Sequence, residues 1–258
     1  MATYLDTIIA RHRRAAALDA RPLASLTEKA MAMPPARGFR HALADLSHLA
    51  VISEIKRRSP SKGELNSGLD PAALARDYEL GGASCLSVLT DEESFGGSVE
   101  DLQVARAAST LPVLRKDFTV CSHDVVDARL MGADCVLLIA AALDPAELIA
   151  CHRLAVEIGL DVLVEIHDEA ELEVALTAGA NLVGVNQRDL VTFQVDHERA
   201  LRMAAVMPTG VVRVAESGVR GPTDAAALHA AGYHAVLVGE TLVTSGDPAA
   251  AVAALIIC

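Results

Sequence analysis

The sequence contains no tryptophan, and aromatic residues make up only 3% of its 258 residues. Because 52% of the residues are nonetheless hydrophobic, a core has to be built mainly from alanine, valine, leucine and isoleucine. Such a core is typical of the parallel strands of α/β proteins, which are buried on both faces. The length allows one or two domains, and α/β barrels of ~250 residues fold as a single domain.

Paired cysteines and long uncharged segments are also missing. The five cysteines are odd in number and contain no C-x-x-C pair, which indicates reduced thiols rather than a disulfide framework. No stretch is both long and uncharged enough to span a bilayer. The first residues lack the apolar region of a secretion signal. We therefore expect a cytoplasmic protein that does not bind membranes.

A basic surface is absent as well. The formal net charge is −12, and the 34 acidic residues are spread along the chain rather than gathered in a tail. This balance argues against binding to nucleic acid or to anionic lipid. An anionic small molecule would have to be held by local basic groups and backbone N–H donors against the overall field.

A regular alternation of apolar strand-like runs and helical stretches begins at residue 51. The eight runs start 20 to 33 residues apart, near Val51, Ser84, Leu111, Asp134, Asp161, Asn181, Val211 and His234. Asp-Pro and Gly-Pro pairs are placed to start several of the intervening helices, and glycines to end them. Residues 1–46 contain no such run and are predicted to form helices packed on the main body, the last of them around Phe39, Leu43 and Leu46.

Eight strand–helix units with right-handed crossovers fit either an open doubly wound sheet or a closed barrel. The open sheet usually carries a G-x-G-x-x-G loop after its first strand, and this chain has none there. We therefore predict an α/β fold, a (βα)8 TIM barrel. It would form a single domain over residues 1–258, with residues 1–46 as an N-terminal helical extension.

The predicted strand ends carry reactive side chains. In such barrels the active site lies at the C-terminal ends of the strands. Five of the eight predicted ends deliver glutamate, lysine or asparagine, which are Glu54 with Lys56, Lys116, Glu165, Asn186 and Glu216. Strand alternation places Glu54 and Lys56 on the same side, where burial is costly unless they pair or are used. A solvated basic loop after an ordinary edge strand is the alternative explanation for the first of these ends.

Two further strand ends indicate an anion site. Ser217-Gly218 and Gly239-Glu240 follow the last two predicted strands, where barrels often bind phosphate through backbone N–H groups. Glycines that merely turn the chain are the alternative there.

Four motifs, in this order, resemble those of the indole-3-glycerol phosphate synthase family: Ser53–Gly63 (SEIKRRSPSKG), Leu114–Phe118 (LRKDF), Gly184–Leu190 (GVNQRDL) and Ala215–Val219 (AESGV). Phe95–Ser98 and Val238–Glu240 match as well, and the resemblance extends over the whole chain. It implies ring closure, decarboxylation and dehydration of 1-(2-carboxyphenylamino)-1-deoxyribulose 5-phosphate to indole-3-glycerol phosphate, in tryptophan biosynthesis. It also implies a carboxy-lyase without a cofactor, with a small anionic substrate as the partner. We expect the protein to be a monomer.

The resemblance also implies roles for individual residues. Lys116 would be the general acid, Lys56 would pair with the substrate carboxylate, and Glu165 and Glu54 would take part in proton transfer. Asn186 and Glu216 would bind the sugar hydroxyls, and Arg188 would brace the loop after the first strand. The phosphate would be held by Ser59, Ser217, Gly218, Gly239 and Glu240. The anthranilate ring would lie against Phe95, Phe118, Leu137 and Leu190.

Two further expectations concern the long loop and metal binding. The 14 residues from Arg57 to Asp70 form the longest predicted loop, which we interpret as a mobile lid over the phosphate. Of the nine histidines only His167 lies at a strand end, with no second histidine at ligand spacing, so no metal site is predicted.

Two other functions fit the fold. Phosphoribosylanthranilate isomerase is also a phosphate-binding barrel, but it needs one acid and one base, usually a Cys/Asp pair, and no lysine pair. A catalytically silent sugar-phosphate sensor would not need the acid–base set of Glu54, Lys56, Lys116 and Glu165.

Overall fold

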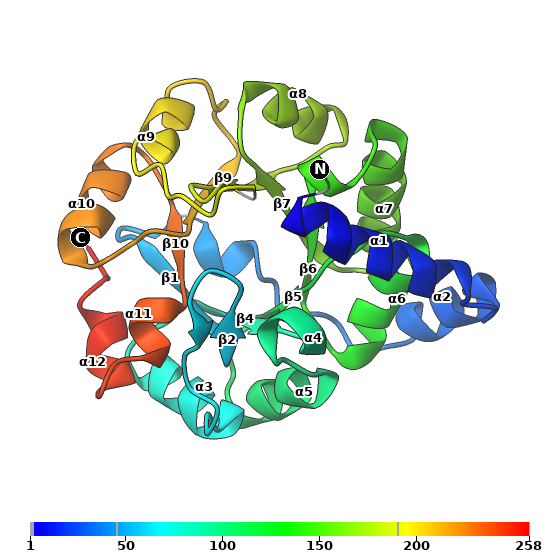
Figure 1. Ribbon diagram of the computed structural model, residues 1–258, viewed down its shortest axis with the longest axis horizontal. Coiled ribbons are helices and arrows are strands. Elements are labelled where there is room, and N and C mark those ends of the chain that lie inside the picture. The colour runs from blue at the N-terminus through cyan, green and yellow to red at the C-terminus, as the bar shows by residue number, and fades with distance from the viewer. Residues whose placement is uncertain (1–2, 45, 190, 258) are drawn as a thin grey trace.

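Eight parallel strands close into a barrel in the computed structural model, which describes residues 3–44, 46–189 and 191–257. Each strand pairs with the next along the chain, and the last pairs with the first (Figure 1). The strands are β1 (Ala50–Ile55), β4 (Cys85–Leu89), β5 (Val113–Lys116), β6 (Cys135–Ile139), β7 (Asp161–Ile166), β8 (Leu182–Asn186), β9 (Val212–Glu216) and β10 (Ala235–Val238). The (βα)8 prediction is confirmed, and every strand begins within two residues of the predicted position.

Helices surround the barrel and connect its strands (Figure 1). Asp70 and Asp144 accept backbone N–H bonds at the starts of two of them, as the Asp-Pro pairs predicted. Gly132 and Gly179 follow helix ends with φ of 97° and 95°, a region that favours glycine. The helices are α3 (Pro71–Leu80), α4 (Glu92–Phe95), α5 (Val99–Ala108), α6 (Ser122–Met131), α7 (Pro145–Glu157), α8 (Glu169–Thr177), α9 (Arg199–Ala204), α10 (Pro222–Ala230), α11 (Glu240–Val243) and α12 (Pro248–Ala253), with a 3-10 turn η2 (Ala140–Ala142).

The apolar side chains form two clusters, because each strand buries both faces. The larger cluster lies between the strands and the surrounding helices, and includes Val51, Tyr78 and Leu138. The smaller cluster fills the barrel interior and includes Ile52 and Leu114.

The N-terminal extension reaches both ends of the barrel. Helix α1 (Tyr4–Ala17) lies across the end formed by the C-terminal ends of the strands, which we call the mouth (Figure 1). Helix α2 (Leu23–Met31) packs beside α6. Phe39 and Leu43 then join the interior cluster together with the first residues of several strands, and so close the opposite end.

Two details of the predicted secondary structure were wrong. The third helix of the extension is only a 3-10 turn, η1 (His41–Leu43), since Phe39 and Leu43 are anchored in the barrel rather than along a helix face. The predicted loop from Arg57 to Asp70 contains a small antiparallel hairpin of β2 (Arg58–Ser59) and β3 (Gly63–Glu64), which closes at Gly63 with φ of 72°.

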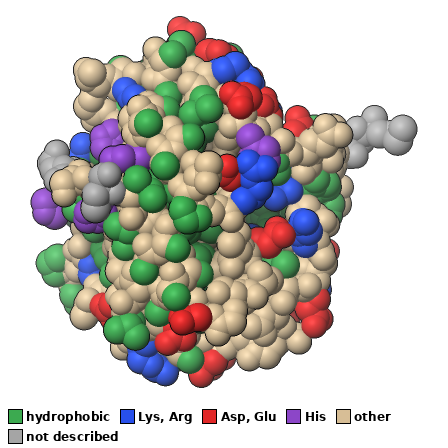
Figure 2. All heavy atoms as spheres, turned by 90° about the vertical axis from the view of Figure 1, so that its left-hand side faces the viewer, with side chains coloured by type: hydrophobic (Ala, Val, Ile, Leu, Met, Phe, Trp, Pro, Cys, Tyr) green, Lys and Arg blue, Asp and Glu red, His purple; other side chains and the backbone are tan. Residues whose placement is uncertain are grey.

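On the face shown in Figure 2, acidic and basic side chains are interspersed with hydrophobic atoms, and no continuous basic surface is visible there. None of the helices in the described part of the chain is long and apolar enough to cross a membrane. The four cysteines within it, Cys85, Cys121, Cys135 and Cys151, are free thiols.

Candidate active site at the mouth of the barrel

A cavity of about 260 Å³ opens at the mouth, where the strand ends meet α1 and the hairpin β2–β3. All but one of the predicted site residues line it: Glu54, Lys56, Ser59, Phe95, Lys116, Phe118, Leu137, Glu165, Asn186, Arg188, Glu216, Ser217, Gly218, Gly239 and Glu240. Leu190, the remaining one, lies outside the described residues. The structure therefore brings together in one cavity residues from all eight barrel strands and the segments that follow them.

Glu54 and Lys56 form an ion pair at the end of β1, as their spacing predicted. The Lys56 Nζ donates to Oε1 of Glu54 at 2.6 Å, and both side chains are largely buried. Burial alone raises the pKa of the Glu54 carboxyl, but the ammonium groups of Lys56 and Lys116 outweigh it and lower that pKa below its usual value. Glu54 is thus held ionised beneath the cavity.

Lys116 at the end of β5 is surrounded by carboxyl groups. Its Nζ lies 3.2 Å from Oε2 of Glu165 and 3.5 Å from Oε2 of Glu216. Burial lowers the pKa of this ammonium group, whereas the neighbouring carboxylates raise it. The carboxylates win, so the pKa of Lys116 lies above its usual value. The sequence alone left the direction of this shift open.

Glu165 and Glu216 share the same surroundings but take different charges. Burial raises the pKa of both, and the field of Lys116 then brings the pKa of Glu165 below its usual value. Glu165 also accepts a hydrogen bond from Nδ2 of Asn186 at 2.9 Å. For Glu216, burial and the charge of Glu165 dominate and raise the pKa to about 8. The shifts therefore favour carboxylates at Glu54 and Glu165, an ammonium group at Lys116 and a protonated acid at Glu216.

Glycines allow the carboxyl groups to approach the backbone. A Cβ atom on Gly184 would lie 2.0 Å from Oε1 of Glu216, and one on Gly239 would lie 2.6 Å from Oε1 of Glu54. Oε1 of Glu216 is buried and has no hydrogen-bond partner among the described residues. Oε1 of Glu216 is therefore packed against the backbone of Gly184, while Oε2 faces Lys116.

The side of the cavity near β9 and β10 offers backbone donors. Ser217 and Gly218 both have positive φ, 63° and 76°. They follow β9, at the end of a barrel where phosphate is often bound by backbone N–H groups. Ser59, Gly239 and Glu240 line the same side of the cavity. The Nζ of Lys62, in the loop after β1, lies 3.5 Å from Oε1 of Glu240.

The opposite side is apolar. Phe95 and Phe118 face each other in a tilted arrangement with ring centroids 6.2 Å apart, and Leu137 lines the cavity with them. Such walls suit the flat apolar part of a ligand.

The extension contributes residues to the cavity that the sequence analysis did not assign. Tyr4, Leu5 and Ile8 of α1 line it, and the Tyr4 ring meets Phe193 edge-on at 5.5 Å. The apolar stripe of α1 was visible in the sequence. Its spacing, however, carries no information about which surface it covers.

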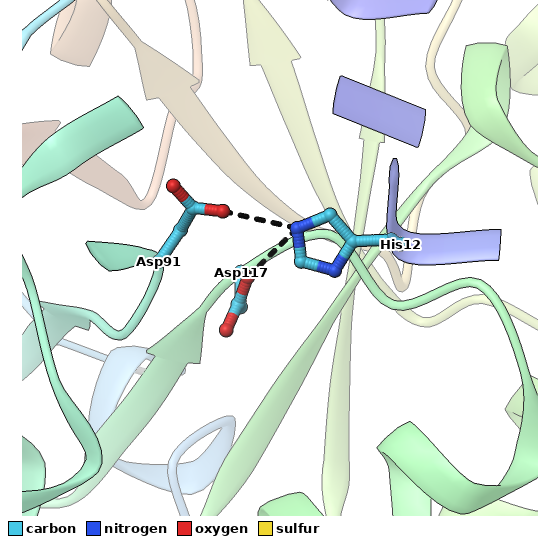
Figure 3. Close-up of side chains that lie close together, drawn as sticks. All are labelled: His12, Asp91 and Asp117. Carbon is cyan, nitrogen blue, oxygen red and sulfur yellow. Dashed lines mark hydrogen bonds and ion pairs between the residues drawn. The ribbon is translucent and has the colours of Figure 1, made fainter. Parts of the chain in front are cut away.

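A second cluster holds α1 in place (Figure 3). The His12 Nε2 lies 3.0 Å from Oδ2 of Asp91 and 3.9 Å from Oδ1 of Asp117. Arg11 also donates to Asp91, and Arg115 donates to Asp117 at 2.9 Å. The His12 ring packs against Phe118 with centroids 5.5 Å apart.

This cluster corrects the prediction that singled out His167 among the histidines. Of the described residues, His12, Asp91 and Asp117 are the group whose donor atoms come close enough to hold a metal ion. Because Arg11 and Arg115 already balance the two carboxylates, we interpret the group as an ion-pair clamp. No sequence pattern predicts this group, since the three residues lie on three separate segments.

Arg188 does not make the predicted contact with the loop after β1. Its guanidinium instead donates to the carbonyl of Phe193, within its own loop, at 3.0 Å. Arg57 braces the loop after β1, through Asp101 and the carbonyl of Leu69. The sequence does not show which arginine contacts the loop after β1, because the long side chains of Arg57 and Arg188 can each reach several neighbours.

Comparison with known proteins agrees with this geometry. The family model described as indole-3-glycerol phosphate synthase matches residues 5–255. The chain belongs to the indole-3-glycerol phosphate synthase family. It is 54% identical to indole-3-glycerol phosphate synthase 2 of Streptomyces coelicolor over 90% of either chain. It is 48% identical to the indole-3-glycerol phosphate synthase of Beutenbergia cavernae over 98% of this chain and 95% of that one.

More distant structures share the fold of this indole-3-glycerol phosphate synthase family member. A thiamine phosphate pyrophosphorylase from Pyrococcus furiosus superimposes with a TM-score of 0.59 over 80% of this chain and 93% of its own, at 15% identity. At this identity the similarity concerns the barrel alone.

Proposed function

We propose that this indole-3-glycerol phosphate synthase converts 1-(2-carboxyphenylamino)-1-deoxyribulose 5-phosphate to indole-3-glycerol phosphate, carbon dioxide and water, with the mouth of the barrel as its active site. One observation carries the assignment of the site. Lys116, kept protonated by buried carboxyl groups, stands between an apolar slot and a group of backbone donors. A substrate with an aromatic ring at one end and a phosphate at the other spans this arrangement.

Lys116 is the general acid of the first step. The ring carbon that bears the carboxylate attacks the ketose carbon, and Lys116 Nζ gives its proton to the ketose oxygen, so that no alkoxide accumulates. The raised pKa keeps the proton on Lys116 until the oxygen becomes basic. Lys56, paired with Glu54, holds the substrate carboxylate before carbon dioxide leaves and the ring regains its aromaticity.

Glu165 and Glu54 act in the dehydration that follows. A carboxylate removes the proton from the adjacent carbon to complete the indole double bond, and this proton is passed through Lys116 to the new hydroxyl, which leaves as water. Glu165 lies within 3.2 Å of Lys116, so protons can be exchanged between acid and base. Asn186 fixes Glu165, and Glu216, whose Oε2 faces Lys116, binds a sugar hydroxyl.

The remaining site residues bind the two ends of the substrate. Ser59, Ser217, Gly218, Gly239 and Glu240 hold the phosphate, the last four through backbone N–H groups. Phe95, Phe118 and Leu137 hold the anthranilate ring, with Leu190 and Arg188 at the adjoining loop. The hairpin β2–β3 closes over the phosphate as a lid.

We further propose that residues 1–258 act as a single-domain monomer in the cytoplasm, without a cofactor and without nucleic-acid partners. The net charge of −12 argues against nucleic-acid partners, and an odd number of cysteines without a C-x-x-C pair is typical of a reducing compartment.

The activity is tested by incubating the purified protein with 1-(2-carboxyphenylamino)-1-deoxyribulose 5-phosphate and following indole fluorescence. We expect turnover without added metal and in the presence of a chelator. A protein that binds this compound without forming indole would be the silent sensor instead. Turnover of phosphoribosylanthranilate alone would point to the isomerase.

A further inference from the structure

His167 lies directly behind Glu165, at the end of β7. It is not among the residues that line the cavity. Its side chain is only 12% exposed, and its Nε2 is a buried atom without a hydrogen-bond partner among the described residues. A buried, unsatisfied ring nitrogen beside a catalytic carboxylate is costly and calls for an explanation.

Glu171 fixes the ring from the other side. One of its oxygens, Oε2, lies 3.0 Å from Nδ1 of His167 and accepts the backbone N–H of the same residue at 2.7 Å. Glu171 stands in the first turn of α8, where its own N–H is capped by Asp168. With Nδ1 held in this way, Nε2 is directed at Glu165, whose Oε1 is 3.9 Å away.

The charged groups around the ring favour the imidazolium form. Burial lowers the pKa of His167, but the hydrogen bond to Glu171 and the charge of Glu165 raise it by more than burial lowers it. The pKa of His167 therefore lies above its usual value. Arg199 of α9 acts in the opposite direction, and its guanidinium is occupied by the carbonyl of Asn186 at 2.9 Å. The charge on His167 in turn contributes to lowering the pKa of Glu165.

We propose that His167 is a positioning residue which, oriented by Glu171, places a positive charge behind Glu165 and keeps that carboxylate ionised and aimed at Lys116. The inference rests on the proposed role of Glu165 in proton transfer. Lys116 alone cannot keep Glu165 ionised throughout the catalytic cycle, since it gives up its proton, and with it its positive charge, to the substrate. A cation on the protected side of Glu165 maintains the carboxylate at that moment.

The charge coupling can be measured without catalysis. The ring of His167 is followed by ¹⁵N NMR during a pH titration, its signal being the one that is lost in His167→Asn. Glu165→Gln and Glu171→Gln should each move the His167 titration to lower pH, because each removes a negative neighbour. The matched control Glu173→Gln, on the exposed face of α8, should leave it in place. A titration that neither substitution moves would overturn the proposal.

The effect on catalysis is measured on His167→Asn, whose side-chain amide can still donate to Glu171 but cannot carry a charge. Loss of an opposite charge within about 4–6 Å moves a carboxyl pKa by roughly one unit or more. The acid limb of kcat/KM should therefore shift upward by about one pH unit, a roughly tenfold loss of activity on that limb, with KM unchanged. A profile that superimposes on that of the unchanged protein would show a structural role only.

The two tests separate the inference from the proposed function. If the unchanged protein made no indole while Glu165→Gln still moved the His167 titration, the proposed function would fail and the charge coupling would stand.

Discussion

The Nζ of Lys116 lies 3.2 Å from Oε2 of Glu165, although strand β6 separates β5 from β7 in the barrel. The contact therefore spans the interior of the mouth rather than joining neighbouring strands. It couples the acid of the ring closure to a base of the dehydration. The raised pKa of Lys116 keeps it an ammonium group at neutral pH, and the lowered pKa of Glu165 keeps it a carboxylate.

Lys116→Met should reduce kcat by at least ~10²-fold, since it removes the general acid. Substrate binding should be largely retained, because the phosphate and ring contacts lie on other residues. Single-turnover fluorescence and calorimetry with a substrate analogue separate the two effects. Lys29→Met, on the exposed side of α2, serves as the control. Unchanged turnover in Lys116→Met would remove this residue from its role.

Gly184→Ala should damage the site through Glu216 rather than through the fold as a whole. The added Cβ would lie 2.0 Å from Oε1 of Glu216, so this side chain must move. We expect a lower kcat and a stability loss of about 1–3 kcal/mol, as is typical of overpacking. Chemical denaturation and steady-state kinetics measure both. Gly246→Ala, which meets nothing within 4 Å, should change neither.

Glu216 should make stability fall with rising pH. Its pKa is raised from 4.5 to about 8, so the folded protein binds this proton more tightly than the unfolded chain does. The contribution is fully present below pH 4.5 and is lost as the pH rises through about 8. Glu216→Gln should flatten the free energy of unfolding between these limits, whereas Glu157→Gln should not. Parallel curves for Glu216→Gln and the unchanged protein would contradict the shift.

His12→Ala should loosen α1 from the mouth. It removes the contact with Asp91 and the packing against Phe118, and leaves α1 tied by Arg11 to Asp91 and by Arg13 to Glu147. We expect faster proteolysis within α1 and a higher KM, because Tyr4, Leu5 and Ile8 form one wall of the cavity. Arg14→Ala, an exposed position of the same helix, is the control. Equal cleavage rates in the two variants would argue against the clamp.

Arg57→Ala should free the hairpin β2–β3. Arg57, at the start of the loop that contains the hairpin, donates to Asp101 and to the carbonyl of Leu69 near the end of the loop. We expect faster proteolytic cleavage between residues 57 and 70, and a substrate analogue should protect the unchanged protein more than the variant. Arg76→Ala on α3 provides the comparison. Absence of protection by the analogue in the unchanged protein would count against closure of the lid.

Much of the fold was predictable because it depends on local pattern. The apolar runs and the Asp-Pro and glycine signals mark the strands and helix ends, and eight such units fit a closed barrel. The hairpin at Arg58–Glu64 and the short turn at His41–Leu43 were missed. The hairpin has only two residues in each strand, too few for a periodic pattern. The turn depends on contacts of Phe39 and Leu43 with the distant strands of the barrel, which no periodicity records.

The candidate site was predictable to the same extent and for a related reason. The C-terminal ends of parallel strands meet at one end of a barrel, so Lys116 and Glu216 could be assigned to one cavity although 100 positions separate them. The partners of Arg188 and Arg57 could not, since long side chains can reach several neighbours.

The sequence by itself determined the barrel, the set of acid and base residues at its mouth, and the family. Only the tertiary structure decided which charge each of those residues carries and what covers them. A pKa depends on distances of a few ångströms between strand ends, as for Glu165 and Glu216. The clamp of His12 on Asp91 and Asp117 likewise depends on where α1 docks, and that follows from the complete surface of the barrel.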